Sequence, residues 1–394
     1  MKLWTNSGDS HALEPDDLWT ERLPADLAVR MPRSETIDDR TERIHVDGRS
    51  FERSKPTSVA VDEDYLRAIG RSGMEVGMAA GELSRPPGAL DVRIRLRDLD
   101  QEGVWGELVY PSIGLWAGLI GDPLLYREGV RVFNDWLEET FLEVTSRLVP
   151  AAEISVLSVE DAVAETVRAA GLGFRAISLP SSLERDGPNW NHENWDPLWD
   201  VAEEAGMVLA VHVGSDAKDP QHPDNRPFRG RGGALMNYVE SSYSGQRMAT
   251  MMVGSGVLDR HPDLRLLISE GGATWVPFVA DRIEEGYRQH GLWARPKLSR
   301  PPREIMYQQV YASFQHDKTA IAACTAMGYR NVMFGTDYPH LEGTFGHTQK
   351  TLHELFDGVD DETTARITRG AFLELFPDVG APPAEWADGA SVGG

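Results

Sequence analysis

The chain has 394 residues, of which 41% are hydrophobic, so it is long enough to bury a large core. Acidic residues outnumber basic ones by 62 to 39, which gives a formal net charge of −23 at pH 7. A surface this acidic repels nucleic acid and anionic membranes, so we expect the partner to be a small-molecule substrate. The single cysteine, Cys324, excludes a disulfide within the chain, and no apolar run is long enough to span a bilayer. We therefore expect a cytoplasmic protein.

Short apolar runs alternate with helical patterns along most of the chain, and each run predicts a strand. The predicted strands are residues 2–6, 106–112, 148–156, 174–182, 207–215, 264–272, 308–314 and 331–339. One intervening helix begins with a capping box formed by Ser158 and Asp161. Strands that alternate with helices run parallel through right-handed crossovers, and eight of them close into a barrel. The fold expected is therefore α/β, a (β/α)8 TIM barrel. The alternative, an open doubly wound sheet, usually has a glycine-rich phosphate loop that this sequence lacks.

Three stretches interrupt the alternation of strands and helices. Residues 12–100 form a large insertion after the first strand, in which Asp47-Gly48 stands between alternating residues and predicts a hairpin turn. Residues 215–236 and 291–305 predict long loops. Loops that follow barrel strands lie at the catalytic face, so we expect lid loops there.

Ionisable residues stand at the ends of several predicted strands. Asp9 and His11 end the first strand two positions apart, a spacing that puts both side chains on one face. His212 ends the fifth strand, Glu270 the sixth and Asp337 the eighth. Taken singly, His212 is typical of a core histidine and Asp337 of a turn residue, but charges in a barrel interior are costly unless paired or bound to a metal. The joint pattern therefore favours a divalent-cation site. The groups expected to converge are Asp9, His11, Glu14, His212, Glu270, Asp337 and His340.

Three segments carry a family resemblance, namely GDSHALEPDDLWTERLP from residue 8, HPDLRLLISEGGATWVPFVADRI from residue 261 and FGTDYPHLEGTFGH from residue 334. They resemble the metal-dependent amidohydrolase superfamily, in the branch related to aminocarboxymuconate semialdehyde decarboxylase. The resemblance runs from about Leu3 to Leu375. It implies a distorted (β/α)8 barrel that holds a metal at the C-terminal ends of its strands. Many members have His-x-His on strand one, a histidine on each of strands five and six, and an aspartate on strand eight.

The resemblance assigns some ligands directly and leaves others open. The residues that match the family's ligands are His11, His212 and Asp337. Asp9 stands where the first histidine of the pair is expected, and Glu270 replaces the strand-six histidine that often contacts substrate or a second metal. Glu14 and His340 recur in this branch, and we interpret them as further metal ligands, as partners of ligands or as substrate contacts.

Carboxylates and imidazoles together favour Zn²⁺, Mn²⁺ or Fe²⁺, and the number of candidate ligands allows one ion or two. An ion with an open position would lower the pKa of bound water from about 16 toward 7. We therefore expect a hydrolase that cleaves an ester, thioester, amide or lactone, with Asp337, His212 and Glu270 as its catalytic residues. The alternative is a non-oxidative decarboxylase of a small carboxylic acid, aromatic acids included. A second alternative is a catalytically inactive barrel subunit.

Trp19 and His316 are the predicted substrate contacts, because aromatic rings near the barrel mouth can line an apolar pocket. The competing interpretation is that such residues pack in the core or lie in solvent. We expect residues 1–377 to form a single barrel domain and residues 378–394 a flexible tail. A homo-oligomer is expected, since barrels of this kind commonly associate.

Overall fold

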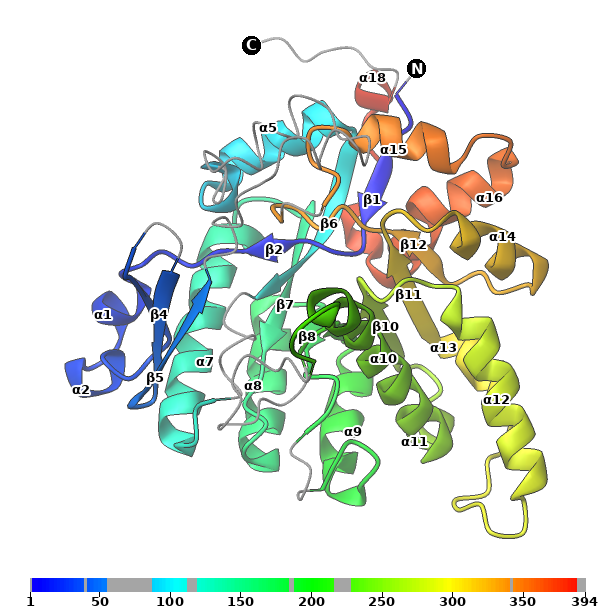
Figure 1. The fold of residues 1–394 in the computed structure, drawn as a ribbon, viewed down its shortest axis with the longest axis horizontal. Helices are drawn as coiled ribbons and strands as arrows, with labels where there is room; N and C mark the ends of the chain where they lie inside the picture. Colours follow the sequence, from blue (N-terminus) through cyan, green and yellow to red (C-terminus); the bar gives the residue numbers. More distant parts are fainter. Residues whose placement is uncertain are drawn as a thin grey trace.

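The computed structural model describes residues 2–38, 41–54, 87–111, 119–183, 188–215, 228–340 and 343–387. Parallel strands surround its centre in an order that follows the chain (Figure 1). They are β1 (Thr5–Ser7), β6 (Val104–Pro111), β7 (Leu148–Glu153), β8 (Ala176–Ser178), β9 (Val208–His212), β10 (Arg265–Ser269), β11 (Val310–Phe314) and β12 (Val332–Phe334). Each lies within or overlaps a run that the sequence predicts as a strand.

The barrel closes between its first and last strands through backbone hydrogen bonds. Gly8 N donates to Phe334 O at 2.9 Å, Asp337 N to Asp9 O at 2.9 Å, and His11 N to Tyr338 O at 2.7 Å. The two-residue strand β2 (His11–Ala12) continues this edge and pairs with β6. The predicted distorted (β/α)8 barrel is thereby confirmed.

Helices cover the outside of the barrel (Figure 1). The α-helices are α1 (Leu18–Arg22), α2 (Ala25–Ala28), α5 (Val92–Glu102), α7 (Pro123–Leu137), α8 (Val159–Leu172), α9 (Asp196–Glu204), α10 (Gly233–Gly254), α11 (Val257–Arg260), α12 (Trp275–Gln289), α13 (Pro302–Gln309), α14 (Lys318–Ala326), α15 (Thr348–Leu355), α16 (Asp361–Ala365), α17 (Ala371–Leu375) and α18 (Ala384–Ala387). Short 3₁₀ turns are η2 (Pro87–Ala89), η4 (Glu193–Trp195) and η6 (Pro377–Val379), and π turns are η3 (Glu138–Leu142) and η5 (Arg366–Gly370). Side chains of Asp91, Asp122 and Ser158 accept hydrogen bonds from the first-turn amides of α5, α7 and α8.

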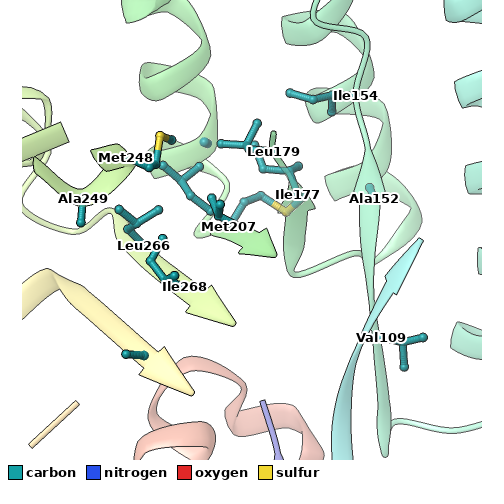
Figure 2. Packing of buried hydrophobic residues seen from close by; sticks show 14 of the residues in the cluster. Val109, Ala152, Ile154, Ile177, Leu179, Met207, Met248, Ala249, Leu266 and Ile268 are labelled. Atoms are coloured by element: carbon teal, nitrogen blue, oxygen red, sulfur yellow. The ribbon is translucent and has the colours of Figure 1, made fainter. Parts of the chain in front are cut away.

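Alternating residues of each strand build two apolar layers, because successive side chains point to opposite faces. The inner layer fills the barrel and includes Val149 and Ala151 of β7, with Phe372 of α17 packed in the same cluster. The outer layer packs under the helices, and Figure 2 shows Leu266 and Ile268 of β10 beside Met248 of α10 in that layer. Burying each such side chain stabilises the fold by about 1.5–3 kcal/mol.

The close contact between α10 and β10 depends on a glycine. A Cβ on Gly245 would collide with the side chain of Ile268. Glycine at this position therefore lets α10 pack closely against β10. Strand β10 pairs with β9, the strand that carries His212.

The insertion after the first strand contains a three-stranded antiparallel sheet. Its strands are β3 (Arg33–Thr36), β4 (Thr41–Val46) and β5 (Arg49–Ser54). The predicted hairpin is confirmed, since Asp47 and Gly48 join β4 to β5 with φ values of 47° and 74°. Residues 55–86 of the insertion and residues 216–227 of the long loop after β9 lie outside the described residues.

Beyond the barrel, the described part of the predicted tail includes α18. The Trp386 indole donates to Asp100 Oδ1 at 2.9 Å, and its ring lies 5.3 Å from that of Trp105.

None of the described helices combines the length and the apolar character that crossing a bilayer requires.

Candidate metal centre

Four ionisable side chains meet at the C-terminal mouth of the barrel. Asp9 follows β1, His11 lies in β2, His212 is the last residue of β9, and Asp337 follows β12. One ligand atom of each lies within 4.8 Å of the others. His11 Nε2 is 3.0 Å from Asp337 Oδ1, and Asp9 Oδ1 is 3.8 Å from His11 Nε2 and 3.5 Å from His212 Nε2. We refer to these four residues as the metal cluster.

The cluster fits a divalent cation on the evidence of its own atoms. Both carboxylate oxygens of Asp9 and of Asp337, and the Nε2 atoms of both histidines, are buried. Their close contacts are with one another and with Glu270 and His340, which are ionisable groups of the same mouth. Two buried carboxylates repel each other unless a cation lies between them. The Nδ1 atom of His212 lies 2.7 Å from Val213 O, so a proton on Nδ1 would leave the Nε2 lone pair free to bind a metal.

The pKa values of the cluster reflect burial and mutual charge. Burial raises the pKa of Asp9 to about 7, and the charges of Asp337 and Glu270 act in the same direction. Burial also lowers the pKa of His11 well below its ordinary value. Burial alone would lower the pKa of His212 and raise that of Asp337. The charge of Asp9 instead raises the pKa of His212, and the imidazoles beside Asp337 hold its pKa below the usual range.

Two further ionisable residues contact the metal cluster from its rim. Glu270 Oε2 lies 3.2 Å from His212 Nε2, and the Glu270 amide donates to Ser313 Oγ at 3.1 Å. His340 Nδ1 lies 2.7 Å from Asp337 Oδ1, and its ring stacks on His11 at 4.0 Å. Glu270 and Asp337 both have left-handed backbones, with φ values of 59° and 55°, a conformation that non-glycine residues adopt mainly where the surrounding structure imposes it.

The floor beneath the cluster is a hydrogen-bonded chain across the barrel. The Tyr110 hydroxyl donates to Ser269 Oγ at 2.7 Å, and Ser269 Oγ donates to Gly8 O at 2.7 Å. The Tyr110 ring lies 5.2 Å from that of His212. This chain ties β6, β10 and the end of β1 together directly under the ligands. Sequence reasoning did not find it, because the contacts join residues far apart in the chain.

A buried arginine supports the cluster from the side. Arg95 of α5 donates to the backbone carbonyl of His11 at 2.8 Å and forms an ion pair with Glu107 of β6. Neither side chain is exposed to solvent. The Arg95 guanidinium also lies 4.8 Å from the centre of the Tyr338 ring, next to Asp337. Arg95 therefore contacts both segments that close the barrel.

Three predicted site residues are not among the four residues of the metal cluster. Glu14 is half-buried after β2. Trp19 of α1 is 4% exposed and belongs to the hydrophobic core, where its ring lies 6.2 Å from that of Phe133. His316 is exposed after β11, and its ring is nearly parallel to that of His347 at 6.3 Å. The roles assigned to these three residues stay predictions.

A (β/α)8 barrel with two imidazoles and two carboxylates at its mouth defines a class of metal-binding barrel proteins. Within that class, a family model described as Amidohydrolase matches residues 112–377, which is more than half of the chain. The chain belongs to the amidohydrolase family, and the resemblance noted in the sequence is confirmed.

Curated relatives that match part of the chain include decarboxylases. The decarboxylase yanB of Aspergillus niger is 23% identical over 194 residues, which cover 47% of this chain and 50% of that protein. The 6-methylsalicylic acid decarboxylase of Penicillium expansum is 24% identical over 202 residues, covering 48% and 56%. The chain spans about half the length of the curated relatives it matches.

Solved structures share the fold over nearly the whole chain. The amidohydrolase map2389c from Mycobacterium avium subsp. paratuberculosis K-10 has a TM-score of 0.75 at 18% identity, covering 95% of this chain and 100% of that one. The 5-carboxyvanillate decarboxylase LigW from Sphingomonas paucimobilis has a TM-score of 0.65 at 17% identity, covering 95% and 99%. A dihydroxybenzoic acid decarboxylase from Polaromonas sp. JS666, solved with bound manganese, has a TM-score of 0.58 at 17% identity, covering 82% and 95%.

The prediction of a hydrolase is wrong, because the matched relatives are decarboxylases and the findings favour the alternative. The prediction rested on the number of candidate ligands, because Glu14, Glu270 and His340 would together allow two ions with a bridging hydroxide, an arrangement that suits hydrolysis. The same set of ligands can instead hold an ion that binds a substrate carboxylate, and residue types alone do not separate these two uses.

Proposed function

We propose that this chain is a metal-dependent, non-oxidative decarboxylase of an aromatic carboxylic acid. The observation that carries the proposal is the buried metal cluster in a chain whose matched curated relatives are decarboxylases. The substrate class follows from the names of the relatives and neighbours, since 6-methylsalicylic acid and 5-carboxyvanillate each carry a carboxyl group on an aromatic ring.

We propose Mn²⁺ as the ion, because the Polaromonas decarboxylase was solved with manganese. A mixed set of carboxylates and imidazoles also suits this ion. The residues that would hold it are Asp9, His11, His212 and Asp337. A divalent cation bound there supplies positive charge that orients the substrate carboxylate and stabilises negative charge on nearby oxygens.

Asp337 is the proposed proton donor. Decarboxylation replaces the ring carboxylate with hydrogen, so the ring carbon that bears the carboxylate must first gain a proton. The bond to the carboxyl carbon then breaks, its electron pair restores the aromatic ring, and CO₂ leaves. No electron is gained or lost overall, so no redox partner is needed. His340 would supply the proton to Asp337, because its Nδ1 lies 2.7 Å from Asp337 Oδ1.

Glu270 and Tyr110 would complete the site. Glu270 Oε2 lies 3.2 Å from His212 Nε2, the atom that would bind the ion, so Glu270 would face the ion and the substrate beside it. Tyr110 is buried against the rings of His11 and His212 and would keep water from the lower side of the substrate.

The test is a decarboxylation assay on the full chain, stripped of metal and reloaded with Mn²⁺. The acids offered are salicylate, 6-methylsalicylate, 2,6-dihydroxybenzoate and 5-carboxyvanillate. CO₂ and the ring product should appear in equal amounts, and only in the metal-loaded protein. Asp263→Asn, which changes an exposed aspartate in the turn before β10, is the control variant and should match the unmodified chain. Full metal occupancy with no CO₂ from any of the four acids would overturn the proposal.

A further inference from the structure

The end of β7 carries an acidic residue that the proposed mechanism does not use. Val149 and Ala151 belong to the inner layer, so the alternation of the strand turns Glu153 toward the inside of the barrel mouth. Its side chain is 3% exposed. The metal cluster and Glu270 extend from the ends of β1, β2, β9, β10 and β12, and β7 lies at the middle of the remaining arc, between β6 and β8. Glu153 therefore lies across the mouth from most of the cluster.

Glu153 is held in place, but half of its carboxyl group has no partner. From α7, the Asn134 side chain bonds both the amide and the carbonyl of Glu153 at 2.9 Å. The Tyr126 hydroxyl donates to Glu153 Oε1 at 3.3 Å. Glu153 Oε2 and Ser155 Oγ are buried and make no hydrogen bond of normal geometry among the described residues. Buried polar groups are normally hydrogen-bonded, so a bound ligand that supplies partners for these two atoms gains affinity.

Burial favours the neutral form of the Glu153 carboxyl. It raises the pKa of Glu153 to about 8, while hydrogen bonds from the hydroxyls of Tyr126 and Ser178 act in the opposite direction. Tyr126 is the titratable group that faces it from α7, and its own pKa is well above 10, so it too is neutral. On the neighbouring strands, β8 presents Ser178, and the Arg95–Glu107 pair of β6 lies beside the start of β7, where Glu107 pairs with Leu148.

We propose that Glu153 and Ser155 form a second substrate-binding subsite, which recognises an oxygen substituent on the aromatic ring remote from the reacting carboxylate. The Glu153 carboxylic acid donates a hydrogen bond to that oxygen through Oε2, and the Ser155 hydroxyl accepts the proton of the substituent. A phenolic hydroxyl satisfies both groups at once, whereas an unsubstituted ring leaves both buried and unpaired. This inference rests on the proposed function, because it assumes that an aromatic acid occupies the mouth.

Binding of unreactive analogues tests the subsite without relying on turnover. A nitro group has the shape of a carboxylate and cannot release CO₂, so 2-nitrophenol stands in for salicylate. Isothermal titration of the Mn²⁺-loaded chain would compare 2-nitrophenol with the four nitrobenzenediols that add one hydroxyl to it. We expect at least one diol to bind roughly tenfold more tightly than 2-nitrophenol, the gain expected for one hydrogen bond to a buried group.

Three variants assign that gain to particular atoms. Glu153→Leu removes the donor and should abolish the preference for the diol while retaining the affinity for 2-nitrophenol. Glu153→Gln keeps a neutral donor and should keep most of the preference, and Ser155→Ala should lose part of it. Glu203→Gln is the control, because Glu203 is a half-buried glutamate of α9 that bonds to His261 on the outside of the barrel. It should leave the preference unchanged.

The pH dependence of KM separates recognition from a structural role. Above about pH 8 the Glu153 carboxyl loses its proton, so KM for a dihydroxybenzoate should rise in the unmodified chain but not in Glu153→Gln. The proposal is overturned if no diol binds better than 2-nitrophenol, or if Glu153→Leu keeps the full preference. If no acid is decarboxylated and the diol preference still depends on Glu153, the subsite stands and the proposed reaction fails.

Discussion

At the scale of single residues, Asp337 contacts one histidine of the metal cluster, His11, and one histidine at its rim, His340. One of its oxygens lies 3.0 Å from His11 and 2.7 Å from His340, and its backbone φ is 55°. We predict that Asp337→Asn lowers kcat by about 10²–10⁴-fold, because an amide cannot pass a proton to the ring. Initial rates measured together with elemental analysis would check this. A variant that retains full metal content and unmodified kcat would show that another group donates the proton.

Replacing Trp19 tests whether this residue packs in the core or contacts the substrate, because the two roles affect different quantities. Because its ring is 4% exposed and packs near Phe133, we predict that Trp19→Ala lowers the free energy of unfolding by about 3–5 kcal/mol. The KM of the folded variant should stay unchanged. Urea unfolding and steady-state kinetics measure the two effects separately. A large rise in KM with little loss of stability would instead support the substrate contact that the sequence predicts.

Some site residues can be recognised from the sequence alone, and others cannot. His212 and Asp337 could be found because each interrupts an apolar run at its end. Glu153 gives the same signal in the run 148–156, yet its importance depends on an unpartnered oxygen, which only three-dimensional contacts reveal. The role of Trp19 stays a prediction, because an aromatic residue in a loop-rich region has the same sequence appearance whether it is buried or lines a pocket.

At the scale of secondary-structure elements, Arg95 links α5 to β6 and to the segment that carries His11. We predict that Arg95→Met lowers the free energy of unfolding by about 3–5 kcal/mol, because it leaves Glu107 charged and buried without a partner. It should also weaken Mn²⁺ binding, since the His11 carbonyl loses its donor.

Urea unfolding and metal titration would measure both effects of Arg95→Met. The double variant Arg95→Met/Glu107→Leu is the control, because it removes both charges. It should recover most of the stability but not the metal affinity. Equal metal affinity in all three proteins would mean that the arginine acts on folding alone.

The elements that the sequence predicted well are those whose burial leaves a periodic pattern. All eight barrel strands overlap runs that the sequence predicts as strands, and the turn Asp47-Gly48 has residues that tolerate positive φ. Strand β3 has no such pattern, because its four residues are all exposed and polar, so only its pairing with β4 defines it. The two-residue β2 is likewise too short to produce a pattern.

At the scale of the whole molecule, an ion that joins the segment around His11 to the segment around Asp337 should contribute to global stability. Binding to the folded chain alone stabilises it by about 4 kcal/mol when the free ion is at 1,000 times its Kd. We therefore predict that EDTA lowers the Tm and that added Mn²⁺ restores it. Differential scanning calorimetry measures the shift, and a chain in which His11 and His212 are both replaced by alanine should show none.

Protonation of Glu153 should make stability depend on pH. Its ordinary pKa is 4.5 and its pKa in the folded chain is about 8, so between these values the folded chain holds a proton that the unfolded chain has released. Stability therefore falls as pH rises from about 4.5 to about 8. We predict that Glu153→Gln becomes progressively more stable relative to the unmodified chain across this window. Thermal melts at several pH values check the trend, and a constant difference would contradict it.

The assembly state of the molecule is a separate question at this scale. The expected homo-oligomer stays a prediction, which light scattering on the purified chain tests. The apolar runs and helical patterns of a sequence indicate which residues are buried within one chain. They do not indicate which surface residues are buried between chains, because such interfaces are about as apolar as the rest of the surface.

The hydrogen bonds that close the barrel between its first and last strands can form only after both strands have been synthesised. Ser7 Oγ accepts a hydrogen bond from the Thr336 amide, although 329 positions separate the two residues. On the ribosome, Asp9 and His11 are synthesised long before Asp337. A nascent chain can offer the ion only a partial set of ligands until Asp337 has emerged, so full-strength metal binding comes after the eighth barrel strand has been synthesised.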